Sequence, residues 1–106
     1  MNIISREDLK EKLDRGDDFK LVMTLSEWAY EAQHIPGSVN VTKPQDVDKY
    51  LDPDDEIVVY CANESCIASQ VAYGILERNG FNNIRRYAGG LSDWQEAGYP
   101  LDGTGI

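Results

Sequence analysis

Residues Glu56 to Leu76 read EIVVYCANESCIASQVAYGIL, an apolar run followed by a polar loop and a helical pattern. The apolar run, residues 57–60, is short and rich in β-branched side chains, which is typical of a strand buried in a parallel sheet. From Val71 onward, apolar residues recur at spacings of three and four, which predicts a helix with one buried face. A strand that leads through a short loop into a helix is characteristic of α/β domains.

A cysteine, Cys61, stands at the carboxyl end of the predicted strand, where α/β sheets bind their ligands. The start of the following helix presents unpaired backbone N–H groups and the positive end of the helix dipole, and both favour a thiolate over a thiol. The same donors would hold an anion formed on the sulfur, such as a persulfide. We therefore predict that Cys61 is a nucleophile; the alternative is a small buried side chain at a strand end.

Strands and helices alternate along the rest of the chain on short connections, which predicts a parallel, doubly wound sheet. The sequence shows no repeats or linkers and predicts one domain, 1–106, with a core of about residues 3–101 and a frayed tail, 102–106. Gly89 and Gly90 are expected to supply positive φ angles for a tight turn near the loop. Further strands are expected at residues 2–4, 19–25, 39–41 and 84–88, and further helices at 5–16, 26–32, 44–51 and 91–97.

Composition and charge restrict the class of protein. The chain has 106 residues, 42% of them apolar, and a net charge of −9 from 19 acidic and 10 basic residues. This charge argues against nucleic acid or an anionic membrane as a partner, and no apolar run approaches the roughly 18 residues of a membrane span. Two cysteines and a lone His34 make neither a disulfide framework nor a zinc site. We expect a cytoplasmic monomer without metal or cofactor, in which His34 hydrogen-bonds a turn.

Three motifs resemble those of one known family. They are EAQHIPGSVN at residues 31–40, VVYC at 58–61, and YAGGLSDW at 87–94 followed by AGYP at 97–100. On these motifs the chain is similar to the single-domain rhodaneses, a branch of the sulfurtransferases, over essentially its whole length. The resemblance implies an α/β, rhodanese-like fold with a five-stranded parallel sheet and helices on both faces. It also implies that Cys61 accepts a sulfane sulfur as a persulfide and passes it to a nucleophile such as cyanide or a thiol.

The second cysteine, Cys66, closes the loop. It is either a core-facing helical residue or a candidate resolving thiol, which would attack the persulfide on Cys61, release sulfide and leave a disulfide. A disulfide requires the two Cα atoms to lie within about 7 Å of each other. Ser69, one turn into the helix, is interpreted as an ordinary helical serine. The predicted site is thus the catalytic Cys61 with five loop residues whose backbone amides would surround the sulfur: Ala62, Asn63, Glu64, Ser65 and Cys66.

The loop has no basic residue and contains Glu64, whose carboxylate repels a dianion, so thiosulfate is expected to be a poor donor. Polysulfides, small-molecule persulfides or persulfidated proteins are the expected donors, and a small-molecule or protein thiol is the expected acceptor. The alternative is a catalytically inactive or regulatory binding module of the rhodanese fold. A phosphatase or arsenate reductase with a related loop is disfavoured, because Ile67 occupies the position where such chemistry needs an arginine.

Overall fold

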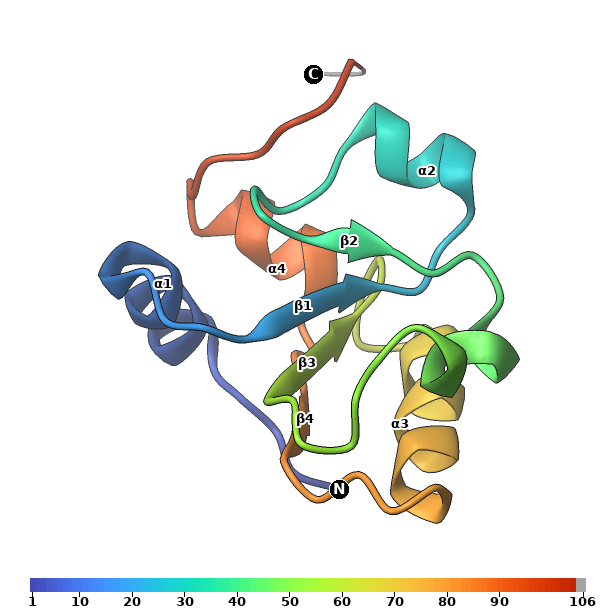
Figure 1. Cartoon of the computed structure of the whole chain (residues 1–106). Coiled ribbons are helices and arrows are strands. Elements are labelled where there is room, and N and C mark those ends of the chain that lie inside the picture. Colours follow the sequence, from blue (N-terminus) through green and yellow to red (C-terminus); the bar gives the residue numbers. More distant parts are fainter. Residues whose placement is uncertain (105–106) are drawn as a thin grey trace.

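The computed structural model describes residues 1–104 and shows an α/β domain built on a parallel sheet (Figure 1). The sheet has the strand order β2-β1-β3-β4. All three strand pairs are parallel, with Val22 opposite Val39, Val22 opposite Val59, and Val59 opposite Arg86. The four strands are β1 (Lys20–Met23), β2 (Val39–Asn40), β3 (Ile57–Tyr60) and β4 (Ile84–Arg86).

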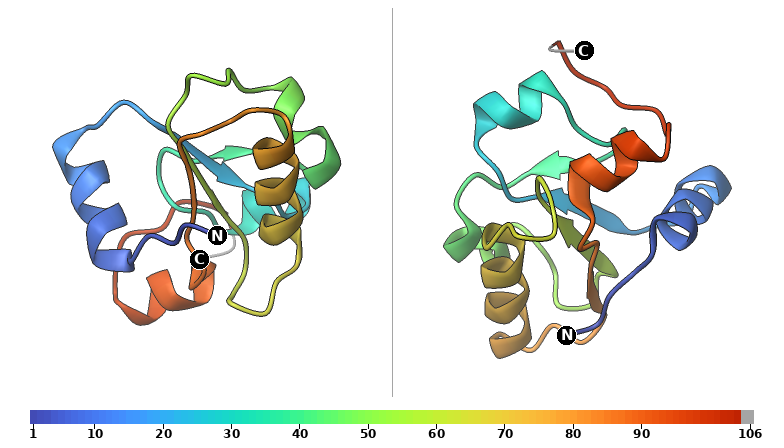
Figure 2. Two further views of the ribbon diagram at one scale, coloured as in Figure 1. Left: turned by 90° about the horizontal axis from the view of Figure 1, so that it is seen from below. Right: turned by 180° about the vertical axis from the view of Figure 1, so that it is seen from behind.

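Helices cover both faces of the sheet, as two further views show (Figure 2). On one face, α3 (Ala68–Arg78) and the 3₁₀ helix η1 (Pro44–Lys49) enclose a core that includes Val59 of β3. On the other face, α1 (Arg6–Arg15) and α4 (Gly90–Glu96) enclose a core that includes Val58 and Tyr60. Alternate residues of β3 thus enter opposite cores, so the strand is buried on both faces and the run of four apolar residues is explained.

Helix α1 begins and ends at the signals that the sequence contains. The Ser5 hydroxyl accepts a hydrogen bond from the Asp8 amide at 3.1 Å, and Gly16 ends the helix with a φ of 72°. Ser26 caps α2 (Glu27–Ala32) in the same way by accepting from the Ala29 amide. The helices expected at residues 5–16 and 26–32 are thus present, and each begins at a serine cap.

The expected fifth strand is absent from the sheet that residues 1–104 form. Residues 2–4 make one isolated parallel bridge, between Ile3 and Arg86, with Ile4 donating to the Arg86 carbonyl at 3.1 Å. Because Ser5 caps α1 directly afterwards, the chain turns away before a ladder can form. The segment expected as a helix at 44–51 is the shorter 3₁₀ helix η1.

The tail expected to be frayed, 102–106, is hydrogen-bonded as far as the structure describes it. Asp102 forms an antiparallel bridge with His34, and the Thr104 amide donates to the Glu31 carbonyl at 2.9 Å. These backbone bonds hold the tail against the end of α2, which its lack of apolar periodicity did not reveal. Residues 105 and 106 of the expected tail lie outside the described residues.

The strand order creates a switch point between β1 and β3. From β1 the chain goes on to its neighbour β2, and from β3 it goes on to β4 on the opposite side. Connections therefore leave these two adjacent strands in opposite directions, and ligands of open α/β sheets bind at the carboxyl ends of such strands. Within residues 1–104, no helix is both long and apolar enough to cross a bilayer.

Candidate functional site

Cys61 lies at the switch point, immediately after β3. Because side chains alternate along a strand, Cys61 follows Ile57 and Val59 onto the face covered by α3. The end of β1 braces this position, since Thr24 donates to the Tyr60 carbonyl through its amide at 3.1 Å and through its hydroxyl at 3.3 Å. The residue that the sequence singled out is therefore held where the two central strands end.

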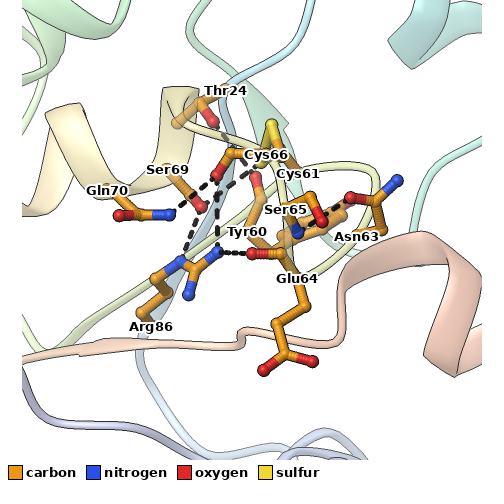
Figure 3. The surroundings of a disulfide bond; sticks show 10 residues. All are labelled: Thr24, Tyr60, Cys61, Asn63, Glu64, Ser65, Cys66, Ser69, Gln70 and Arg86. Atoms are coloured by element: carbon orange, nitrogen blue, oxygen red, sulfur yellow. Dashed lines mark hydrogen bonds between the residues drawn. A yellow bond between two sulfur atoms is a disulfide. The ribbon is translucent and has the colours of Figure 1, made fainter.

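Cys61 and Cys66 are joined by a disulfide (Figure 3). Their Cα atoms are 6.4 Å apart, within the range that a disulfide spans. Cys61 is only 1% exposed in this form, so its sulfur is closed to an attacking donor until the bond is reduced. Cys66 is half-buried at the surface end of the loop rather than in the core, which leaves it accessible to a reductant.

The loop amides are partly engaged in this disulfide-bonded form. The Ser65 amide donates to the Asn63 side-chain oxygen at 3.0 Å, and the Cys66 amide donates to the Asn63 carbonyl at 3.1 Å. Among residues 1–104, no loop amide donates a hydrogen bond to the Cys61 sulfur. In the disulfide-bonded form, Asn63 folds the loop into a turn of its own. The expectation that the loop amides surround an anionic sulfur concerns the reduced or persulfidated form and stays a prediction.

The amino end of α4 packs against the strand exit. The Leu91 amide donates to the Cys61 carbonyl at 3.0 Å, and the Ser92 amide donates to the Ala62 carbonyl at 2.9 Å. Gly90 adopts a φ of 64°, as expected, which lets the backbone approach the loop. The expectation of a positive φ at Gly89 is wrong, since its φ is −62°.

Two residues outside the predicted site lie directly under the loop, Ser69 of α3 and Arg86 of β4. The Ser69 hydroxyl lies 3.3 Å from the Cys61 sulfur, and the Arg86 Nε donates to that hydroxyl at 2.9 Å. The Arg86 guanidinium also donates to the carbonyls of Glu64 at 3.0 Å and Cys66 at 3.4 Å (Figure 3). The loop, which has no basic residue of its own, is thus supported by a cation from a neighbouring strand.

The alternation of side chains along β4 indicates which face of the sheet Arg86 points to. Ile84 is buried against α3, and a residue two positions further along β4 must point to the same face. That residue is Arg86, at the carboxyl end of the strand beside β3, which is where the cysteine loop begins. The sequence alone gives the arginine no role, because only the pairing of β4 with β3 brings it beneath the loop.

Two polar aromatic residues near the strand ends, His34 and Tyr60, have structural roles. The His34 ring stacks on Tyr30 and donates from Nδ1 to the Tyr30 carbonyl at 2.6 Å, so the ring stabilises the carboxyl end of α2. Tyr60 directs its hydroxyl into the opposite core, where it accepts from the Ile35 amide at 3.0 Å. Burial raises the pKa of Tyr60 to about 12, although its bonds with Ser38 and Ile35 oppose the change.

A hollow of about 600 Å³ lies along the sheet edge, away from the cysteines. Residues of β2, the connection after it and η1 line this hollow, among them Val39 and Tyr50. None of its lining residues belongs to the cysteine loop, and we assign no role in sulfur chemistry to it.

Known proteins resemble this chain in sequence and in structure. It is 31% identical over 101 residues to the HTH-type transcriptional regulator Rv0324 of Mycobacterium tuberculosis, covering 93% of this chain and 44% of that protein. It is 30% identical over 94 residues to the putative sulfur carrier protein YrkF of Bacillus subtilis, covering 86% of this chain and 49% of that protein. The chain therefore spans about half the length of the curated relatives that it matches.

The solution structure of the rhodanese-like domain from the Alr3790 protein of Anabaena sp. superposes with a TM-score of 0.85 at 27% identity. That superposition covers 99% of this chain and 81% of the other. The family described as Rhodanese-like domain matches residues 5–97, a range that includes every strand, the cysteine loop and α4. The chain therefore belongs to the rhodanese-like domain family.

Proposed function

We propose that this protein is a sulfurtransferase that carries a sulfane sulfur on Cys61. The observation that supports the proposal most directly is the position of Cys61 at the exit of a central strand, beside a second cysteine within bonding distance. The name of the Bacillus subtilis relative, a putative sulfur carrier, points the same way. A reducing compartment such as the cytoplasm would maintain the dithiol form that the reaction needs.

The reaction has two transfers. The Cys61 thiolate attacks the outer sulfur of a polysulfide or persulfide, the donor leaves as a thiolate or a shorter polysulfide, and Cys61 becomes a persulfide. An acceptor thiolate or cyanide then attacks the terminal sulfur, and the Cys61 thiolate leaves. No metal or organic cofactor is needed for either step.

The second cysteine, Cys66, could react with the persulfide on Cys61 before an acceptor does. The Cys66 thiolate would attack the Cys61 sulfur and expel the terminal sulfur as hydrosulfide, leaving the disulfide present in the structure. A dithiol reductant would then return both cysteines to the reduced state. In this proposal Cys66 is a resolving thiol that discharges the carrier when no acceptor arrives.

The relative from Mycobacterium tuberculosis supports a second candidate function. Because that protein is named as a transcriptional regulator, this chain could instead be a regulatory module whose loop reports a redox or sulfide signal without turnover. The 1% exposure of Cys61 in the oxidised form fits such a role, since the disulfide closes the site. Turnover separates the two candidates, because a module without catalysis forms no product.

The test compares the reduced wild type with Cys61→Ser and Cys66→Ser. After exposure to inorganic polysulfide, the Cys66→Ser protein should gain about 32 Da on the peptide that contains Cys61. Addition of cyanide should then remove this mass and form thiocyanate over repeated cycles. Thiocyanate formation by Cys61→Ser at the rate of the wild type would refute the proposal, and a stable mass gain without turnover would favour the regulatory module.

A further inference from the structure

We propose that Arg86 and Ser69 form a buried positioning pair that holds and activates the Cys61 sulfur as an anion. This inference rests on the proposed function, because it assigns residues to the same sulfur chemistry. The two residues come from β4 and α3 and are 6% and 1% exposed. Neither belongs to the cysteine loop, and the contacts between them connect the loop to the sheet beneath it.

The first argument is the charge of Arg86. A buried guanidinium is costly unless an anion balances it. Across residues 1–104, none of the ion pairs involves Arg86, and its partners are the Ser69 hydroxyl and two backbone carbonyls, all neutral. The sulfur of a reduced or persulfidated Cys61 would supply the missing negative charge.

The second argument is the direction of the Ser69 proton. The Arg86 Nε–H donates to the Ser69 oxygen, so the hydroxyl is an acceptor on that side. A disulfide sulfur carries no hydrogen, so the 3.3 Å contact with Cys61 can only be the Ser69 O–H donating to sulfur. The arginine therefore orients the hydroxyl, and the hydroxyl is aimed at the reacting atom.

The same geometry would assist both halves of the transfer. In the free enzyme, a hydrogen bond from Ser69 favours the Cys61 thiolate over the thiol. When the acceptor attacks the persulfide, Cys61 is the leaving group, and a stabilised thiolate leaves faster. Ser69 touches the reacting sulfur directly, whereas Arg86 acts through Ser69 and through the loop carbonyls.

Arg86 also fixes the orientation of the loop. In a trans peptide, the carbonyl and the following N–H point in opposite directions. Because the carbonyls of Glu64 and Cys66 turn toward the guanidinium, the N–H groups of Ser65 and Ile67 face away from it. The arginine thereby determines which side of the loop presents donors.

The other charged groups around the loop are few. Glu64 is exposed, and its side chain extends away from the sulfurs (Figure 3). On α4, Asp93 is held by the Tyr87 hydroxyl at 2.6 Å and by Arg6, and α3 presents the uncharged Ser69 and Gln70 to the loop. Arg86 is therefore the charged group that contacts the Cys61–Ser69 pair from below.

The test measures how the alkylation rate of Cys61 by iodoacetamide depends on pH, in the reduced 106-residue chain carrying Cys66→Ser. Adding Ser69→Ala should raise the midpoint pH by about one unit, because one hydrogen bond to the thiolate is lost. Ser69→Thr keeps a hydroxyl and should restore the original midpoint. Ser92→Ala, at an exposed serine whose amide binds the loop, is the matched control and should change nothing.

Arg86→Lys tests the second member of the pair and should also raise the midpoint, since an ammonium group cannot reproduce the planar fork. It serves as the test if Ser69→Ala does not fold. Both variants should also transfer sulfur from a preformed persulfide to cyanide about tenfold more slowly. An unchanged midpoint in Ser69→Ala or in Arg86→Lys would overturn the inference.

The alkylation assay uses no sulfur donor, so its outcome is independent of the proposed function. If the midpoint shifts but Cys61 accepts no sulfur from polysulfide, the positioning pair stands and the sulfurtransferase proposal fails. If Cys61 accepts and transfers sulfur while the midpoint is unchanged, the proposed function stands and the pair is refuted.

Discussion

The Cα atom of Gly90 faces the carbonyl oxygen of Cys61 so closely that a β-carbon at position 90 would lie 2.3 Å from that oxygen. No carbon and oxygen atoms approach so closely without bonding, so this contact requires glycine. The same carbonyl accepts the hydrogen bond from the Leu91 amide. The strand exit and the start of α4 are therefore joined at a distance that only glycine permits.

Gly90→Ala should consequently displace α4 from the loop and lower the free energy of unfolding by about 3 kcal/mol or more, since backbone rather than a flexible side chain opposes the new methyl group. Chemical denaturation measures the loss. The matched control is Gly98→Ala, because Gly98 also has a positive φ, 77°, but a β-carbon added there would meet nothing within 4 Å. That control should show only the conformational cost, about 1–2 kcal/mol. Equal losses in both variants would contradict the prediction.

The buried Tyr60 hydroxyl predicts a loss of stability at high pH. Its pKa is raised to about 12 in the folded protein, from an ordinary value of 10.0. Because the folded pKa is the higher one, the stabilisation is fully present below about pH 10 and is lost as the pH rises from about 10 to about 12. Denaturation of the wild type across this range should show the decline, and Tyr60→Phe should make it shallower.

At neutral pH, Tyr60→Phe should itself cost about 1–3 kcal/mol, because the Ile35 amide loses its buried acceptor. Tyr50→Phe is the control, since the Tyr50 ring is 68% exposed. It should leave both the stability and its pH dependence unchanged. The same pH dependence in Tyr60→Phe as in the wild type would show that another group is responsible.

Glu64 is expected to disfavour thiosulfate through charge. Glu64→Gln should raise kcat/KM for thiosulfate a few-fold at low ionic strength and should change the rate with a singly charged organic persulfide less, because repulsion grows with the charge of the donor. Added salt should abolish the difference. The control is Glu77→Gln, which removes an equal charge far from the loop. Glu77 lies about 14 Å along the α3 axis from Ala68, the first residue of that helix. A thiosulfate rate insensitive to Glu64→Gln would exclude this explanation.

The resolving role of Cys66 predicts a short-lived persulfide. After brief exposure to polysulfide, the reduced wild type should convert to a species about 2 Da lighter than the dithiol, as sulfide leaves and the disulfide forms. Cys66→Ser should retain the added sulfur far longer. Intact-mass measurements on acid-quenched time points distinguish the two proteins. Equal persulfide lifetimes would show that Cys66 does not attack the Cys61 sulfur.

Local sequence patterns predicted most of the fold, and the features that they missed depend on long-range contacts. The apolar run of β3 and the serines at the starts of α1 and α2 each specify their element from within a few residues, and the strand and both helices are confirmed. The N-terminal segment has strand composition, but whether it forms a ladder depends on how soon α1 begins. The tail has no apolar pattern to predict its place, since backbone hydrogen bonds and the Thr104 hydroxyl hold it to Glu31 and His34.

In the candidate site, too, some features follow from local sequence and others depend on long-range contacts. The position of Cys61 could be predicted, because a strand, a loop and a helix start follow one another within a few residues of it. The loop turn at Asn63 has no distinct signal in the sequence, because an asparagine side chain can bind either solvent or its own backbone. Arg86 is 20 residues from Cys66, and its place beneath the loop follows from the β3–β4 pairing rather than from any motif.

The backbone around Cys61 has different hydrogen-bond partners before and after residue 62. The carbonyls of residues 60–62 are tied to Thr24, Leu91 and Ser92, which belong to the surrounding scaffold. Beyond them, residues 63–66 bond to one another, to the Arg86 guanidinium, to the Gln70 side chain and through the disulfide. Breaking that cross-link should loosen a tip of four residues while the domain beneath keeps its shape. We therefore expect a protein that discriminates between the oxidised and reduced forms to contact this tip, since the rest of the surface should be the same in both.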